Sequence, residues 1–570
     1  MMQVFPTTHG GGMEELGRAS ILFVVLLVAG CSSEPSEPTD PGFPRTASGE
    51  GEGVELQNSP HRALNAVPQL KIDLPLEPRP WDSDPEALVS AVAEAHGNVM
   101  IGLKPLAKRR ALENDGIRPA LSREEFQAGL DLLHAFGVKV KRVLNSFGAV
   151  AAKIEPADAP TIQGQGLVDY VEPESYAVLS GKRFASDGSV STANLFSQTT
   201  PWGVSVVRAQ PAWQKEMGSG ATVMIIDTGH DQGHEDLPSV SSGDCYGTYG
   251  GCSDANGHGT HVVGDLMARN NSLGSLGVAP GVSGSNVISW AACDSVGECL
   301  RSEIATALDS AASWEIDVVN LSIQGPYHTG IANAVSLASS ADVFMVASAG
   351  NNTGSTVQYP AGYFSVMGVS GVKSDSSFAS TSPCSSASGY GVHVDLAAPF
   401  WSYNAEPGDT YADEDEGYCG NSFSTPHVAG AAALIRAEKP NLPRSYVWNR
   451  LIDTAEDLGS SGWDSYFGEG LLDVKGALGP FADIDGLASV QPNQTCEWSA
   501  MQTGGNGPFS YQWRRNSTPV GTDRFYSYEV GTTGFELRLT VTDSDGWADT
   551  KVLWVTVSAQ GSECAAEENP

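Results

Sequence analysis

Three short segments contain the side chains that hydrolysis by a nucleophile requires. Asp227 ends the apolar run 222–226, His258 lies between two glycines, and Ser422 precedes an apolar helical run. A histidine can take the proton of a serine hydroxyl, and a buried aspartate can orient the imidazole and stabilise its charged form. Orphan N–H groups at the start of a helix can hold the developing oxyanion. These residues predict acyl transfer with Ser422 as nucleophile and His258 as base.

Each of these residues also has a purely structural interpretation. An aspartate after a strand is often a turn residue, and a serine at the start of a helix is often only an N-cap. His261, three residues after His258, is a rival base, and either histidine can be a hydrogen-bonded core residue. The glycines around His258, which let a substrate backbone approach closely, favour the catalytic interpretation.

The elements that must position these residues alternate between apolar strands and helices over residues 197–480. Strands are expected at 222–226, 287–291, 318–323 and 343–348. This alternation predicts an α/β fold with a mostly parallel sheet that has helices on both faces.

Smaller units are expected on both sides of this domain. Residues 94–180 contain short strands and a helical pattern at 124–136, which predicts a compact α+β unit. Residues 481–570 contain short alternating strands without helices and resemble a PKD or immunoglobulin-like β-sandwich. Residues 32–93, rich in Pro, Glu, Ser and Gly, are expected to form a disordered tether, and residues 181–196 a linker.

The chain order Asp, His, Ser resembles the subtilisin-like serine proteases, and so do segments 225–229, 256–264 and 420–430. The resemblance implies a serine endopeptidase that acts on proteins or peptides. By its position ahead of the protease, the unit 94–180 resembles the propeptide of this family. It would act as an intramolecular inhibitor until self-cleavage between about 179 and 196.

The resemblance also implies further site residues. Asn351, which ends the segment 347–351, would donate its amide to the oxyanion together with the N–H of Ser422. Gln324 stands where this family commonly has glycine. Gln358 stands at the base of the primary specificity pocket and should make that pocket shorter and more polar. The implied substrate-binding residues are Ser322, Ile323, Gln324, Gly325 and Gln358.

A structural calcium ion is implied by the same resemblance. Segment 270–280 is similar to the calcium loop of the family, and oxygen ligands suit a hard cation. A metal-free loop is the alternative. The implied ligands are Gln198, Asp236, Arg269, Asn271, Leu273 and Ser275.

The first 31 residues resemble a bacterial lipoprotein signal peptide. The apolar run 21–29 is shorter than the roughly 20 residues that span a bilayer, but it has the length of a signal-peptide core. It is followed by Gly30 and Cys31, and Cys31 is the expected lipidation site. This predicts an exported protein anchored to a bacterial membrane, with release outside the cell as an alternative once the propeptide is removed. A buried strand is the structural alternative.

Cysteine content and charge fit an exported protein. Apart from Cys31 there are eight cysteines without a tight metal or redox spacing, which favours disulfides in an oxidising compartment. One connectivity compatible with the spacing pairs 245 with 252, 293 with 299, 384 with 419, and 496 with 564. The excess of 67 acidic over 32 basic residues, a formal charge of -35, disfavours nucleic acid as a partner.

Two alternative functions remain open at this stage. The first is an inert surface lipoprotein on a protease fold, against which the complete set of Asp227, His258, Ser422 and Asn351 argues. The second is an adhesin that binds through residues 481–570 and uses proteolysis only for its own maturation.

Overall fold

The computed structural model describes residues 79–104, 121–183, 197–240, 244–250, 252–352, 354–380, 387–412 and 418–564. The expected signal peptide, Cys31 and most of the tether lie outside the described residues. Within the described ranges, none of the helices combines the length and apolar character needed to cross a membrane.

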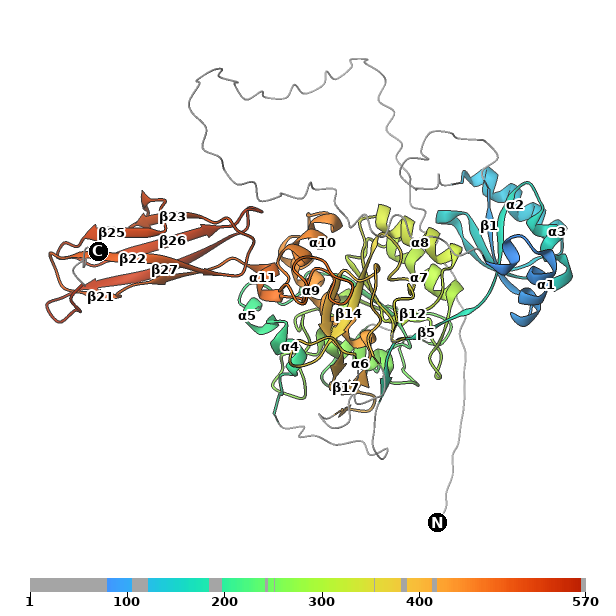
Figure 1. Cartoon of the computed structure of the whole chain (residues 1–570), viewed down its shortest axis with the longest axis horizontal. Helices are drawn as coiled ribbons and strands as arrows, with labels where there is room; N and C mark the ends of the chain where they lie inside the picture. Colours follow the sequence, from blue (N-terminus) through green and yellow to red (C-terminus); the bar gives the residue numbers. More distant parts are fainter. Residues whose placement is uncertain are drawn as a thin grey trace, which may run out of the picture. The chain divides into compact units, whose positions relative to one another are not determined.

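The N-terminal unit is an antiparallel sheet with helices packed against it (Figure 1). The strand order is β2-β3-β1-β4, with β1 Asn98–Leu103, β2 Lys139–Leu144, β3 Ala149–Lys153 and β4 Val168–Pro173. The helices are η2 Pro80–Asp82, α1 Pro85–Glu94, α2 Arg123–Ala135, η3 Asn145–Phe147, η4 Pro156–Asp158 and α3 Ala159–Gln163. Ser122 and Glu125 form a capping box at the start of α2, and Phe126 and Leu133 are buried on this helix. The α+β unit expected here is present, but it begins before residue 94. Helices η2 and α1 occupy the end of the segment 32–93 that was expected to be a disordered tether, because Asp84 caps α1 and its Leu88 and Val92 are buried.

The central domain is built on a seven-stranded sheet in which all neighbouring strands are parallel. In spatial order the strands are β15 Leu396–Pro399, β14 Val366–Val372, β13 Phe344–Ser348, β11 Val318–Leu321, β7 Val223–Asp227, β9 Val287–Ala291 and β8 Cys245–Tyr246. Alternate residues of β7 enter different cores: Val223 and Ile225 pack on one face, and Met224 and Ile226 on the other. The predicted parallel sheet is confirmed.

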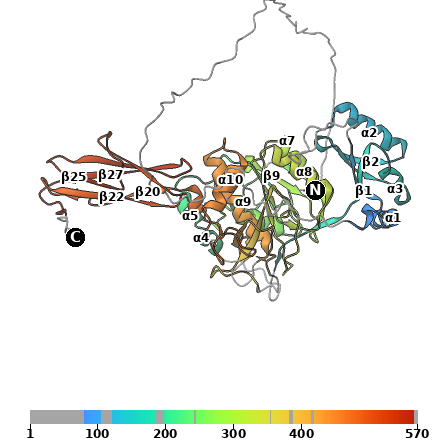
Figure 2. The ribbon, with the colours of Figure 1, turned by 45° about the horizontal axis from the view of Figure 1, so that its top comes forward.

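Helices cover both faces of this sheet, as predicted. The core on one face includes residues of α6 His258–Met267 and α9 Asn421–Glu438, and the core on the other includes residues of α7 Arg301–Ser313 and α8 Thr329–Ser340. Helix α9, coloured orange in Figure 2, contacts α6 and strands β11, β13, β14 and β15. Within the described residues, the other helices of this domain are α4 Trp202–Val206, α5 Ala209–Ala212, η6 Gly284–Asn286, α10 Arg444–Asp453 and α11 Val474–Leu478.

Short strands complete the central domain and connect it with residues 176–183. They are β5 Tyr176–Leu179, β6 Lys182–Arg183, β10 Glu298–Leu300, β12 Ile323–Gln324, β16 Trp401–Ser402, β17 Ala405–Glu406, β18 Thr410–Tyr411 and β19 Tyr418–Cys419. Strand β5 lies between β10 and β12, and β6 pairs with β19. The segment expected to end the propeptide and begin a linker is therefore paired with the protease on both sides of Ser180.

The C-terminal region folds as two β-sheets around one core. One sheet contains β20 Phe481–Asp485, β22 Thr495–Thr503 and β25 Phe525–Glu529. The other contains β21 Ser489–Val490, β23 Ser510–Arg515, β24 Thr518–Gly521, β26 Phe535–Thr542 and β27 Ala548–Val557. Trp498 and Trp513, one from each sheet, are fully buried in the shared core. The helix-free β fold agrees with the prediction.

Arg450 of α10 binds a turn of the C-terminal region. Its guanidinium lies 2.8 Å from Asp543 Oδ2 and 2.6 Å from Asp545 Oδ2, and it stacks on the ring of Trp547. Its other nitrogens donate to the carbonyls of Ala477 and Gly479. Because the Arg450 side chain is completely buried, this contact is a structural joint and not a surface ion pair.

Disulfides join Cys245 to Cys252, Cys293 to Cys299, and Cys496 to Cys564. These are three of the four pairs given by the expected connectivity. Cys384, the expected partner of Cys419, lies outside the described residues.

Candidate active site

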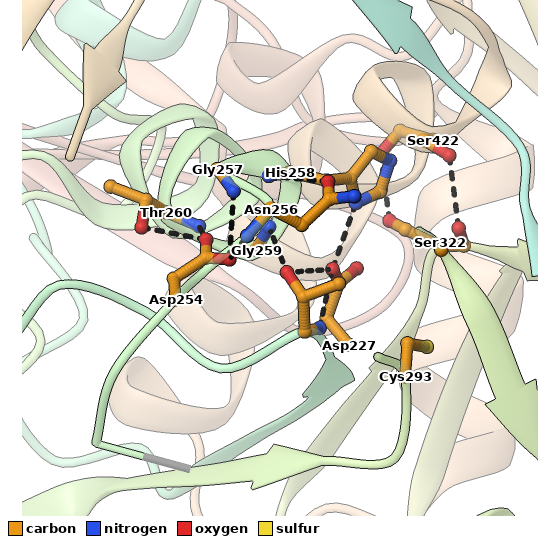
Figure 3. A network of polar contacts seen from close by, with 12 residues as sticks. Asp227, Asp254, Asn256, Gly257, His258, Gly259, Thr260, Cys293, Ser322 and Ser422 are labelled. Carbon is orange, nitrogen blue, oxygen red and sulfur yellow. Dashed lines mark hydrogen bonds and ion pairs between the residues drawn. The ribbon is translucent and has the colours of Figure 1, made fainter. Parts of the chain in front are cut away.

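Strand β7 and helix α6 bring Asp227 and His258 together. Asp227 is the last residue of its strand, His258 is the first of its helix, and both are almost completely buried. His258 Nδ1 lies 2.8 Å from Asp227 Oδ1 (Figure 3). The same carboxylate oxygen accepts the backbone N–H of Thr228 at 2.8 Å. An N–H on Nδ1 that faces this carboxylate leaves Nε2 free to act as a base.

Asp254, which the sequence analysis did not single out, fixes the loop that carries His258. Its Oδ1 accepts the backbone N–H groups of Asn256 and Gly257, and its Oδ2 accepts both the N–H and the hydroxyl of Thr260 (Figure 3). Gly257 has a φ of 95°, a left-handed conformation that favours glycine. Asp254 lies three residues before Gly257, the N-cap of α6, so a search of N-cap positions in the sequence would not have indicated it.

The rival histidine His261 belongs to a different network. His261 Nε2 lies 3.2 Å from the hydroxyl of Ser402, which donates to Asp265 Oδ1. Asn404 Nδ2 donates to the same oxygen at 3.2 Å. Complete burial raises the pKa of Asp265 to about 8. These contacts support His258, the histidine paired with Asp227, as the base.

The Asp265 carboxyl predicts an unusual dependence of stability on pH. Because its pKa is raised in the folded state, the folded protein binds one proton more than the unfolded chain between about pH 4 and pH 8. The contribution of this group therefore falls as pH rises, by at most about 1.4 kcal/mol per pH unit. Asp265→Asn cannot ionise, so relative to wild type it should gain stability from pH 5 to 8 and change little above pH 8.

Melting temperatures of Asp265→Asn and its parent, both in a Ser422→Ala background that prevents self-digestion, would test this. The difference between the two variants is expected to change with pH in the stated direction. A difference that stays constant from pH 5 to 9 would mean that Asp265 is already ionised in the folded protein.

Ser422 lies in the first turn of α9, and its hydroxyl points away from the imidazole. It donates to the carbonyl oxygen of Ser322 at 2.9 Å and lies 2.9 Å from the hydroxyl of Ser180. His258 Nε2 has no hydrogen-bond partner among the described residues. A β-carbon built on Gly181 would lie 3.0 Å from that nitrogen, so the Gly181 backbone lies directly against the imidazole.

The carbonyl oxygen of Ser180 accepts two hydrogen bonds at the start of α9. One comes from Asn351 Nδ2 and the other from the backbone N–H of Ser422 at 3.2 Å. Asn351 is held in place because its Oδ1 accepts the N–H of Asn421. Gly420 has a φ of 143°, and a β-carbon there would lie 2.3 Å from the Ser180 oxygen. The two donors predicted for an oxyanion thus meet at one carbonyl.

The residues before Ser180 lie as a strand between two protease strands. In β5, Val178 pairs with Glu298 of β10 and with Gln324 of β12, both antiparallel. Ala177 is buried and Val178 is 43% exposed, so alternate side chains face the protein and the solvent. This is recognition of a peptide by strand addition.

The side chain of Ser180 occupies a small, closed site. Its hydroxyl bonds to the hydroxyl of Ser348 at the end of β13. A β-carbon built on Gly350 would lie 2.5 Å from Gln358 Cγ and 3.1 Å from Gln324 Oε1, so both glutamine side chains cover this glycine. Gln324 Oε1 also accepts the N–H of Asn351 at 2.7 Å. The predicted substrate-binding residues Gln324 and Gln358 therefore converge over Gly350, next to Asn351, which binds the Ser180 carbonyl oxygen.

The predicted calcium ligands also lie together. The side-chain nitrogen of Gln198 faces the backbone oxygens of Arg269, Leu273 and Ser275 at 2.5–3.0 Å, and Asn271 Oδ1 at 3.4 Å. An amide nitrogen has two hydrogens and cannot satisfy four acceptors.

Asp236 lies beside this group. Its Oδ2 accepts the N–H of Ser275 at 2.7 Å, and its buried Oδ1 has no hydrogen-bond partner in the described part of the chain. This excess of oxygens around one point is the donor set that a hard cation requires.

The fold and the site together define a serine hydrolase. A parallel α/β sheet carries an Asp–His pair, and a serine at the start of a neighbouring helix lies beside two donors that hold a carbonyl oxygen. A peptide segment of the chain itself is bound across this site.

Comparison with known proteins gives the family. Residues 218–470 match the subtilase family, peptidase S8. Alkaline protease of Alkalihalobacillus alcalophilus is 31% identical over 399 residues, which cover 69% of this chain and 94% of the relative. Subtilisin DY of Bacillus licheniformis is 38% identical over 49% of this chain and 99% of the relative, and subtilisin E of Bacillus subtilis is 33% identical over 64% and 89%. The chain belongs to the subtilase family and is a subtilisin-like serine endopeptidase.

Proposed function

We propose that Ser422, His258 and Asp227 catalyse peptide hydrolysis, with Asn351 and the Ser422 N–H as oxyanion donors. His258 Nε2 takes the proton of Ser422, whose Oγ forms a bond to the carbonyl carbon. The C–N bond then breaks as His258 returns the proton to the leaving amine, and water releases the acyl group by the same steps. The observation that carries this proposal is the convergence of both donors on the Ser180 carbonyl oxygen.

The first substrate is the protein's own Ser180–Gly181 bond. Its carbonyl is held by the oxyanion donors, its amine side lies against His258, and the flanking strands β5 and β6 are paired with the protease. The unit that ends at Ser180 is thus an inhibitory propeptide bound as an uncut substrate, and the catalytic domain follows it up to about residue 480. For attack, the Ser422 hydroxyl has to turn from Ser322 toward His258.

Fragment masses test this assignment directly. The soluble chain from about residue 34 should convert to two fragments, one ending at Ser180 and the other beginning at Gly181. A fluorophosphonate probe should label Ser422 only in the second fragment. A first cut inside 184–196, with Ser180–Gly181 left intact, would contradict the assignment of the bond.

The closed site around Ser180 supports a preference for small residues before the cleaved bond. Ser180 bonds to Ser348, and Gln324 and Gln358 cover the floor at Gly350. A large apolar side chain would have to displace two amides whose polar groups would then need new partners. We therefore assign Ser, Ala and Gly as the preferred residues at this position.

Gln358→Gly should enlarge the pocket and shift this preference. Full burial of a Leu or Phe side chain contributes about 1.5–3 kcal/mol, or roughly 10- to 150-fold in kcat/KM. Peptides that differ only at the position of Ser180 would measure the ratio of Phe to Ser cleavage. Gln502→Gly, in the C-terminal region, is the matched control and should leave the ratio unchanged. An unchanged ratio in Gln358→Gly would exclude Gln358 as a determinant.

The oxygens around Gln198 support a structural calcium ion. With its amide oxygen turned inward, Gln198 would join the three backbone oxygens, Asn271 Oδ1 and the unpaired Oδ1 of Asp236. The set holds one carboxylate. The ion would tie residues 198–200 to the domain and supply no chemistry.

Removal of calcium should therefore lower stability and leave the chemistry intact. A ligand that binds only the folded state stabilises it by about 4 kcal/mol at 1,000 times its Kd. In a Ser422→Ala background, the melting temperature should fall on addition of a chelator and recover with calcium. Asp236→Asn should lose most of this response. A melting temperature that does not depend on calcium would exclude the site.

From the sequence, we also propose that the protein is exported and lipidated at Cys31. The short apolar core and the small residues before Cys31 support export and lipidation. Cleavage at Ser180–Gly181 separates the protease from this anchor covalently, so the mature enzyme stays at the membrane only while its propeptide remains bound.

A further inference from the structure

The propeptide places two carboxylates at the start of two protease helices. Glu174 Oε1 accepts the N–H of Ser302 in the first turn of α7, at 3.2 Å. Glu172 accepts the N–H groups of Thr329 and Gly330 in the first turn of α8, at 3.2 and 3.3 Å. The residue before α7, Leu300, has no side chain that can cap the helix. Glu174 therefore serves as the side-chain acceptor for the Ser302 N–H at the start of α7, where Glu303 in the same turn is a second carboxylate.

Arg301, the first residue of α7, is a buried cation at the same place. Only 4% of it is exposed, its Nη2 donates to the carbonyl of Tyr176 at 3.3 Å, and its Nε has no partner among the described residues. Glu172 and Glu174 of the propeptide act on its charge from beyond ion-pair distance. Both precede Ser180, so propeptide release removes them together. A buried cation without a counter-ion is costly. In the mature enzyme, an anion bound at this place would therefore stabilise the charge of Arg301.

The path from Arg301 to the catalytic serine is a single extended strand. Counting Ser180 as the first residue before the bond, Glu174 is the seventh. Strand β5 holds the intervening residues in register with β10 and β12, and the N–H of Arg301 donates to the carbonyl of Ser175 at 3.4 Å. An extended substrate that uses the same edges would present its seventh residue to Arg301.

The space beside Glu174 can accept a side chain other than the one now present. A cavity of about 770 Å³ adjoins Glu174 and is lined on the protease side by Thr248, Leu300, Ser302 and Glu303. The one protease carboxylate in this lining, Glu303, accepts hydrogen bonds from Thr248 and Trp290 Nε1 and forms an ion pair with Arg142 of the propeptide at 2.9 Å. Once Arg142 has left with the propeptide, the groups of the protease that can bind a carboxylate here are Arg301 and the N–H groups at the start of α7, with Glu303 held in place by Thr248 and Trp290.

We propose that, in the mature enzyme, Arg301 and the N–H groups that begin α7 form a subsite for a carboxylate seven residues upstream of the cleaved bond. The site selects protein substrates with Glu or Asp at that position. This inference rests on the proposed assignment of Ser180–Gly181 as the bond in the active site.

Peptides with the chain's own sequence 173–183 provide the test, cleaved by enzyme that has processed itself and been separated from its propeptide. One peptide keeps Glu at the position of Glu174, a second has Gln there, and a third moves Glu to the position of Ser175. A charge-assisted hydrogen bond at a partly buried site is expected to raise kcat/KM about tenfold for the first peptide over the other two. A shorter peptide that begins at Tyr176 measures cleavage without the subsite.

Two enzyme variants test whether Arg301 causes the preference for Glu over Gln. Arg301→Met should reduce the preference for Glu over Gln from about tenfold to about onefold, whereas Arg538→Met, which removes one exposed charge of the C-terminal region, should keep it. If Arg301→Met does not fold, the wild-type comparison still decides. Equal kcat/KM for the Glu and Gln peptides, with the short peptide cleaved, overturns the subsite and leaves the proposed function standing. Failure to cleave any peptide at Ser–Gly overturns both.

Discussion

Ser422→Ala is expected to remain a single uncut chain and to lose peptidase activity by a factor on the order of 10⁶ in kcat. Removal of the nucleophile costs this much in subtilisin, where the residual rate comes from the oxyanion donors and binding alone. Here the loss should be visible without any added substrate, because the Ser180–Gly181 bond already lies against Ser422 and His258. Intact mass over several days, together with fluorophosphonate labelling, measures it.

The control for this variant is Ser424→Ala, which removes a hydroxyl two residues later in the same helix. The Ser424 hydroxyl donates to the carbonyl of Pro399 and, among the described residues, makes no hydrogen bond to segment 176–183. This variant should process itself and label as wild type does. The calcium response of melting shows whether Ser422→Ala is folded. Self-cleavage at the same bond by a folded Ser422→Ala chain would eliminate Ser422 as nucleophile.

The sequence was sufficient to predict a parallel sheet and four of its seven strands, β7, β9, β11 and β13, whereas β8, β14 and β15 were not predicted. The strands of this sheet are buried on both faces, so each predicted strand appears in the sequence as an apolar run. Such a run can be recognised without knowing which strands lie next to it in the sheet. Asp227, His258 and Ser422 each lie at the end of an element, where local sequence specifies the turn. Such local signals can be recognised in the sequence without knowledge of the tertiary structure.

The identity of the bound peptide bond could not be predicted in the same way. Residues 176–183 have no motif, and Gly181 begins a stretch that by composition is a linker. Their register is set by pairing with β10, β12 and β19, which are distant in sequence. Pairing of this kind depends on edges that exist only after the protease has folded.

The Asp543–Gly546 turn illustrates the same limit. Its composition correctly indicates a turn between strands, but a sequence pattern says nothing about what a turn contacts. In the structure, Asp543 and Asp545 bind the fully buried guanidinium of Arg450. This joint weighs against the view that residues 481–570 act mainly as a separate adhesive module, because part of their surface is already committed to the protease.

Asn351→Ala is expected to lower kcat by about 10²- to 10³-fold while the chain still labels at Ser422. Loss of one oxyanion donor raises the barrier by about 3–4 kcal/mol, and the Ser422 N–H remains to hold the oxygen. The rate of self-cleavage at Ser180–Gly181 should fall by a similar factor, which makes the intact precursor accumulate. Single-turnover conversion of precursor and kcat on a peptide would both measure the effect.

Asn351 also accepts the N–H of Asn421, so Asn351→Ala removes a structural hydrogen bond as well as an oxyanion donor. Asn351→Asp separates these roles, because its carboxylate can still accept from Asn421 but repels a developing oxyanion. It should therefore fold at least as well as Asn351→Ala and be no more active. If Asn351→Asp were instead the more active variant, the role of Asn351 would be to position Asn421 and the start of α9. Stabilisation of the oxyanion would then rest on the Ser422 N–H alone.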